Sequence, residues 1–143
     1  MDILTEVATY VYTGLDLTPG TDFFLHNLPQ GVSEGVVLQS ISLSEGFYGL
    51  SLTRMSVFFL YPSWATIKTN IDILTDILHY AYGTLDGTWS LTGDISTENY
   101  GIDDLDRYIS AVSFTVAYGK TQTLTASEIA QIKATTQTLL EEE

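Results

Sequence analysis

The segment YISAVSFTVAY, from Tyr108 to Tyr118, alternates over about 11 residues, roughly twice the usual length of a strand. Successive side chains of a strand point to opposite faces, so this segment has two unlike faces. The bulky face holds Tyr108, Ser110, Val112, Phe114, Val116 and Tyr118, and the small face holds Ile109, Ala111, Ser113, Thr115 and Ala117. Small side chains admit close approach, so we expect a helix to pack on the small face. A contact between subunits is the alternative.

Three other segments have helical spacing. The first has apolar residues from Leu4 to Leu15 along one stripe, with Asp2 as its N-cap and Gly14 near its end. The strongest pattern covers residues 63–82 and ends before Gly83. A third helix is expected after Thr125, where Glu128 completes the spacing of a capping box, and it runs into an acidic end.

Shorter strands are predicted at residues 23–26, 35–44, 54–61 and 88–95 from β-branched and aromatic content between turn residues. The fold class that follows is α+β, with helices packed on a mixed, mostly antiparallel sheet. The expected order is α-β-β-β-α-β-β plus a C-terminal helix. We assign residues 1–120 to a single domain and residues 121–143 to a helical extension with an acidic tail.

Composition excludes several classes of protein. Hydrophobic residues make up 45% and aromatic residues 12%, which is too apolar for a disordered chain. A net charge of −13 repels phosphate, so tight binding of nucleic acid is not expected, although contact with DNA without adhesion is compatible with it. The absence of cysteine rules out disulfides and thiolate chemistry. We predict neither a secretory signal nor a membrane span, and therefore a soluble protein made in a cytoplasm.

The sequence offers little for catalysis. Its two histidines, His26 and His79, are interpreted as structural or surface residues, and no serine-nucleophile, P-loop or dinucleotide motif is present. Five acidic residues suggest a loop that could attract a hard cation: Asp94, Glu98, Asp103, Asp104 and Asp106. The EF-hand pattern fails, because Asn99 and Leu105 occupy its sixth and twelfth positions. We favour a solvated acidic loop over a weak divalent site, and predict no catalytic, cofactor or metal residues.

Phe47 and Tyr48 lie between Gly46 and Gly49 in a predicted turn. Aromatic side chains at a turn tip cost solvation unless they fold back or meet a partner. Both readings stay open, so these two residues are candidates for a contact with a neighbouring molecule.

Four stretches of the sequence together carry a resemblance. They are a predicted N-terminal helix, DILTEVATYVYTGL, an LPQG turn, a buried strand leading into a long helix, RMSVFFLYPSWATIKTNIDILTDILHYA, and the aspartate-bearing loop that opens the final strand, GIDDLDRYISAVSFTVAYGK. With these elements in this order, the chain over residues 1–120 resembles the tail terminator family of long-tailed viruses, which includes minor capsid and tail-completion proteins. These are patterns of fold, and the resemblance does not extend to the C-terminal segment.

The resemblance implies a structural virion protein with no enzymatic activity, assembled in the host cytoplasm. Such proteins form a homo-oligomeric ring, usually a hexamer, that caps the tail tube, stops its growth and joins it to head connector or neck proteins. DNA would pass through the ring, and an acidic lumen would repel it. We therefore expect Asp103, Asp104 and Asp106 to line this channel, and Phe47 and Tyr48 to contact the next subunit or the tube. The acidic composition also suits a haloarchaeal host.

Two other functions compete with tail termination. A head-completion or neck adaptor would also be a ring without chemistry, with twelve-fold instead of six-fold symmetry. A small acidic module that inhibits a basic partner would be a monomer or dimer with salt-sensitive binding. An enzyme is the least supported class, and loss of an activity on mutation of Asp103 or His79 would revive it.

Overall fold

A computed structural model describes residues 3–45, 50–81, 89–119, 130 and 133–134 of the chain. These residues form two helices and five strands, in agreement with the predicted α+β class. The elements in chain order are α1 (Ile3–Gly14), β1 (Phe23–Leu25), β2 (Gly35–Glu45), β3 (Leu50–Tyr61), α2 (Trp64–Tyr80), β4 (Trp89–Ile102) and β5 (Tyr108–Gly119).

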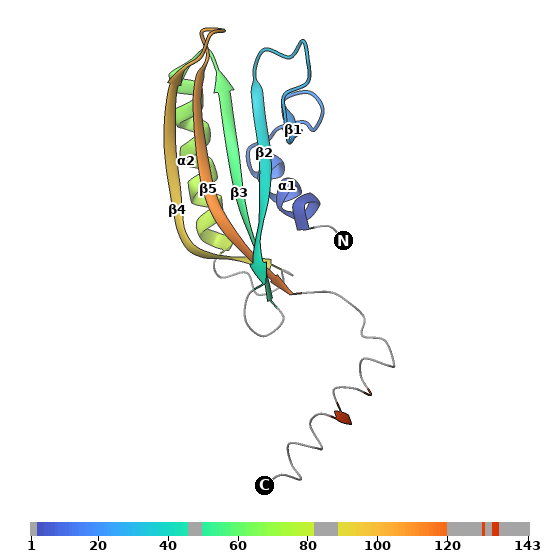
Figure 1. Cartoon of the computed structure of the whole chain (residues 1–143). Coiled ribbons are helices and arrows are strands. Elements are labelled where there is room, and N and C mark those ends of the chain that lie inside the picture. The colour runs from blue at the N-terminus through green and yellow to red at the C-terminus, as the bar shows by residue number, and fades with distance from the viewer. Residues whose placement is uncertain (1–2, 46–49, 82–88, 120–129, 131–132, 135–143) are drawn as a thin grey trace.

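The strands form a single mixed sheet in the order β1-β2-β3-β5-β4. Short β1 pairs in parallel with β2, and the other three pairings are antiparallel. Long β5 therefore lies inside the sheet between β3 and β4, where both of its edges are hydrogen-bonded. Both helices lie behind the strands in Figure 1, so the sheet has one covered face and one open face.

Helix α2 begins where its sequence predicts, and both helices bury the predicted apolar stripe, whereas Asp2, the predicted N-cap of α1, lies outside the described residues. Ser63 caps α2 in an extended conformation, and its hydroxyl accepts a hydrogen bond from the amide of Thr66 at 3.4 Å. Ile67, Leu74 and Leu78 then repeat along the buried stripe of α2. α1 contributes a buried stripe of its own to the same core.

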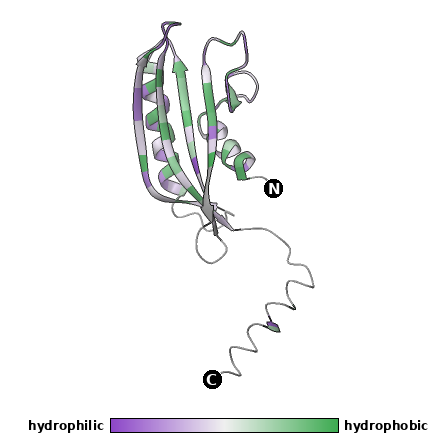
Figure 2. Cartoon of the chain, viewed as in Figure 1, coloured by the Kyte–Doolittle hydropathy of each residue, from purple (hydrophilic) through white to green (hydrophobic). Residues whose placement is uncertain are grey.

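The helices cover the bulky face of β5, not the small one. Val112, Phe114 and Val116 belong to the core that also contains the buried residues of α1 and α2. The expectation of a helix on the small face is therefore wrong. Large side chains fill the space between sheet and helices, whereas the small residues of β5 belong to the open face. Figure 2 shows hydrophobic residues along β2 and β3 and a hydrophilic stretch on β4.

Strand β4 is longer than predicted, extending to Ile102 instead of ending near residue 95. Two irregularities in its pairing with β5 allow this: one lies between Thr92 and Ser96, the other between Asn99 and Gly101. Gly93 and Gly101 have positive φ angles of 74° and 83°, which a residue with a side chain rarely adopts. Two glycines among polar residues usually indicate a loop, which is why the sequence predicted a loop where the structure has a strand.

Strand β3 begins at Leu50, four positions before the predicted start. The predicted C-terminal helix lies almost wholly outside the described residues, although Ala130, Lys133 and Ala134 have helical backbone and are exposed. Among the described residues, neither helix combines the length and apolar character that crossing a bilayer requires.

Candidate functional site

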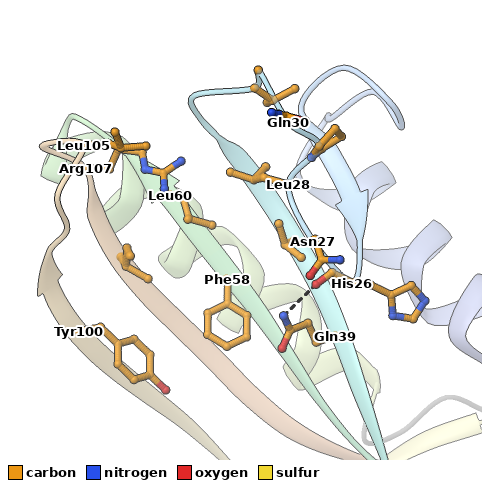
Figure 3. Close-up of a pocket in the computed structure, with 15 residues that line it drawn as sticks. His26, Asn27, Leu28, Gln30, Gln39, Phe58, Leu60, Tyr100, Leu105 and Arg107 are labelled. Atoms are coloured by element: carbon orange, nitrogen blue, oxygen red, sulfur yellow. Dashed lines mark hydrogen bonds between the residues drawn. The ribbon is translucent and has the colours of Figure 1, made fainter.

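The open face of the sheet contains a groove with a volume of about 630 Å³. Its floor combines side chains from four strands: Val37 and Gln39 of β2, Phe58 and Leu60 of β3, Ile109 of β5 and Tyr100 of β4 (Figure 3). On β2, β3 and β5 these residues alternate with residues that face the helices, which places them on the other side of the sheet, and Tyr100 of β4 reaches the same side by stacking on Phe58. The floor is therefore largely apolar without being part of the core.

An aromatic pair supports one side of the floor. The rings of Phe58 and Tyr100 stack with centroids 6.1 Å apart and planes 29° apart. The hydroxyl of Tyr100 donates a 2.7 Å hydrogen bond to the carboxylate of Glu98, which raises the pKa of Tyr100. The pair joins β3 to β4 across β5, above the small side chain of Ala111.

One wall of the groove is the loop of residues 26–32. The amide of His26 donates to the carbonyl of Leu38 at 2.9 Å. The side-chain amide of Gln39 donates to the carbonyl of His26 at 2.8 Å (Figure 3). These bonds anchor the start of the loop to β2. Leu28 and Val32 then line the groove from the side.

The opposite wall is the turn between β4 and β5, organised by Asp103. One carboxylate oxygen accepts the amides of Leu105 and Arg107, each at 3.0 Å. The other accepts the Nε and Nη2 groups of Arg107 at 2.9 and 2.8 Å. The hydrogen bond from the Arg107 side chain is the main reason that the pKa of Asp103 lies below its ordinary value of 3.8.

Arg107 also connects the two walls. Its Nη1 donates to the backbone carbonyl of Ser33 at 2.9 Å, although the two residues are 74 positions apart. The Asp103–Arg107–Ser33 chain of contacts, which we call the Arg107 clasp, crosses the end of β3 and closes one end of the groove. A planar guanidinium suits this role because it can serve both acceptors at once.

Away from the clasp the open face becomes polar. The guanidinium of Arg54 donates to the hydroxyls of Thr115 and Ser96, each at 3.1 Å, and the hydroxyls of Ser56 and Ser113 lie 2.8 Å apart. In the part of the chain that the structure describes, Arg54 forms no ion pair with a carboxylate. Both arginines of the chain, Arg54 and Arg107, thus lie on the open face.

The structure separates the residues that the sequence grouped as an acidic loop. Asp94 and Glu98 belong to β4 and are exposed, so their assignment to a loop is wrong. Asp103 is held by Arg107, whereas Asp104 and Asp106 are exposed beside it in the β4–β5 turn. No three acidic or histidine side chains within the described ranges converge as a metal-binding group.

Four other residues were singled out in the sequence: Phe47, Tyr48, His26 and His79. Phe47 and Tyr48 lie outside the described residues, so their proposed contacts stay predictions. His26 contributes its backbone to the groove wall, and its exposed ring turns away from Phe58 and Leu60 (Figure 3). His79 lies exposed on α2.

No protein-family model matches the chain, and no curated protein matches it.

The groove and the Arg107 clasp were not predicted from the sequence. Two signals pointed to them. Phe58 and Leu60 alternate with the buried residues of β3, so this strand is apolar on both faces, and Asp103 precedes Arg107 by four positions in a tight turn. The partner of the clasp, Ser33, has no signal in the sequence because its backbone carbonyl is what accepts the bond.

Proposed function

We propose that this chain is a structural virion protein that forms a ring on the end of a viral tail tube, limiting its length and joining it to the head connector. The observation that carries the proposal is the one-sided sheet: both helices lie on one face, and the other exposes a largely apolar groove. A surface of this kind favours association with another protein. The resemblance to tail terminators supplies the identity of the assembly.

The two edges of the sheet oppose the addition of a strand from another chain, which leaves the open face as the surface for association. Edge strand β4 has two bulges and carries Asp94 and Glu98, and the opposite edge strand, β1, contains three residues. Bulges, charges and short length all oppose the addition of a strand from another chain. Subunits would therefore meet through the open face and the loops around it.

Light scattering of the purified full-length chain, at low and at molar salt, tests the ring. We expect a species of about six times 15.8 kDa, and electron microscopy should show a six-fold ring with an open channel. Twelve-fold symmetry would assign the chain to neck adaptors instead. A monomer under both conditions that binds a basic protein with salt-sensitive affinity would replace the proposal with the inhibitory module.

The acidic turn provides a prediction about DNA passage. Asp104 and Asp106 are exposed and, in this proposal, face the channel, where their charges repel phosphate. Neutralising both as Asp104→Asn with Asp106→Asn should raise the affinity of the ring for double-stranded DNA at low salt by about tenfold, since each lost repulsion removes a fraction of a kcal/mol or more. Asp103 is left intact because it holds the clasp.

A matched control removes the same charge from the helical side. Asp72 and Asp76 are exposed on α2, and the variant Asp72→Asn with Asp76→Asn changes net charge equally. A gel-shift or anisotropy titration should show tighter DNA binding for the turn variant alone. Equal gains in both variants would assign the effect to overall charge and remove these aspartates from the lumen.

A further inference from the structure

The open face exposes large apolar side chains on the groove floor and around it. Tyr100 on the floor is 55% exposed, Leu105 at the rim 66% and Ile41, further along β2, 67%. The energetic cost of leaving such residues in water is relieved when another apolar surface covers them. We therefore expect the groove to bind a segment with an apolar surface.

The dimensions of the groove suit one α-helix. From β2 to β4 the floor crosses three strand spacings, or about 14 Å. A helix with its side chains is about 10–12 Å across. The loop of residues 26–32 on one side, and Tyr100 with Leu105 on the other, would flank it.

The chain itself contains a segment with the required pattern. Residues 125–143, which we call the C-terminal segment, follow β5 and have Ile129, Ile132 and the pair Leu139/Leu140 at helical spacing. Helices that dock in grooves present anchors of this spacing. Ala130, Lys133 and Ala134 within the segment have helical backbone and are exposed.

Charge determines the direction in which the segment would lie. It carries four glutamates and one lysine, and three of the glutamates, Glu141 to Glu143, are at its end. Arg54 lies at one end of the open face, where its partners among the described residues are two hydroxyls, whereas Asp104 and Asp106 flank the other end. The acidic end therefore belongs beside Arg54. The distance from Leu60 to Arg54 along β3 is about 20 Å, close to the ~16 Å from Ile129 to Leu140 in a helix.

This direction excludes docking within one chain. The helix would have to begin at the clasp end of the groove, near Ile109, whereas its own chain leaves the sheet at Gly119, about 33 Å away along β5. The connecting residues from Lys120 to Leu124 span at most about 18 Å. We infer that the groove binds the C-terminal segment of a neighbouring copy, with Ile129 and Ile132 over Phe58 and Leu60 and the terminal glutamates beside Arg54.

Each copy would then use two different surfaces, its groove and its C-terminal segment. Contacts of this head-to-tail kind produce closed rings when the rotation between copies closes. The inference deepens the ring proposed above, but it can fail separately, because a ring could be held together by other surfaces.

Two full-length variants test the two surfaces independently. The groove variant, Tyr100→Asp with Leu105→Asp, changes side chains that are exposed, and the segment variant is Ile129→Asp with Ile132→Asp. Each variant alone should run as a monomer of 15.8 kDa by light scattering and keep the far-ultraviolet circular dichroism spectrum of the folded wild type. Its thermal midpoint should be lower than that of the wild type, because assembly stabilises the folded state. Ile73→Asp, at a 38% exposed position on α2, serves as the control and should assemble normally.

Mixing the two variants distinguishes a neighbouring copy from the same chain. The groove variant still has an intact segment, and the segment variant an intact groove, so the mixture should form a heterodimer of about twice the monomer mass. A mixture that stays monomeric would overturn the inference in favour of docking within one chain. Assembly of either variant alone at the wild-type mass would also overturn it, while leaving the ring in place. A wild-type chain that is monomeric at all concentrations would contradict both.

The charge contact has its own test by reversal and rescue. At low salt, Arg54→Glu should raise the protein concentration needed for half-maximal assembly by at least tenfold. Combining it with Glu141→Lys, Glu142→Lys and Glu143→Lys should reverse at least half of that change on a logarithmic scale. Failure of the combined variant to recover, with the far-ultraviolet circular dichroism spectrum of the folded wild type, would show that the terminal glutamates lie elsewhere.

Discussion

Replacement of Phe59 by alanine is expected to lower the free energy of unfolding by about 3–5 kcal/mol. The ring of Phe59 is fully buried in the core between the sheet and the helices, and in the sheet it lies between Val36 of β2 and Ser110 of β5. Its removal leaves a cavity that neighbours on two paired strands cannot fill. Because domains of this size are stable by about 5–15 kcal/mol, the loss would be a large fraction of the total.

The adjacent residue gives a matched control. Phe58 has the same side chain on the same strand but lies on the open face, half-buried against Tyr100. Phe58→Ala should cost about 1–2 kcal/mol, since its ring is already partly in water. Urea unfolding of both variants measures the difference, with the slope m as a check on two-state behaviour. Equal losses would contradict the assignment of the two faces of β3.

Alkaline pH is expected to destabilise the protein through Tyr61. Burial, and then the charges of Asp22 and Glu34, raise the pKa of Tyr61 to about 12, whereas its ordinary value is 10.0. Between these values the folded protein keeps a proton that the unfolded chain releases, so the free energy of unfolding falls as the pH rises. Two pH units correspond to at most about 2.7 kcal/mol.

Tyr61→Phe isolates this contribution. The variant has no proton to lose at this position, so its free energy of unfolding should decline less than that of the wild type from pH 10 to pH 12. Other tyrosines and lysines titrate equally in both proteins and cancel in the difference. Urea unfolding at half-unit steps of pH measures it. Parallel curves would mean that the Tyr61 hydroxyl is solvated in the folded state.

Much of the fold could be predicted because local patterns carry it. The stripes of α1 and α2 and the alternation of β5 are properties of neighbouring residues, and the structure confirms them. The length of β4 was missed because glycine and acidic residues usually mark loops, whereas here they form bulges paired to β5. Pairing with a distant strand overrides this local preference.

The candidate site was less predictable, for a related reason. Phe58, Tyr100 and Leu105 come from separate segments and meet only because β5 lies between β3 and β4. The Arg107 clasp depends on a backbone carbonyl that is 74 positions distant, which no side-chain pattern encodes. Asp103, identified from the sequence as an acidic residue, acquires its role as the partner of Arg107 only in the folded turn.

The sequence alone determined that this chain folds as one α+β domain, that β5 has a bulky and a small face, and that the chain has a net charge of −13. Each of these properties follows from residue type and spacing along the chain. Only the tertiary structure decided which face of the sheet the helices cover, and therefore where an open groove lies. Alternation with a period of two distinguishes the two faces of a strand but does not determine which face the helices cover. The covered face depends on the volume to be filled between the sheet and helices from distant parts of the chain.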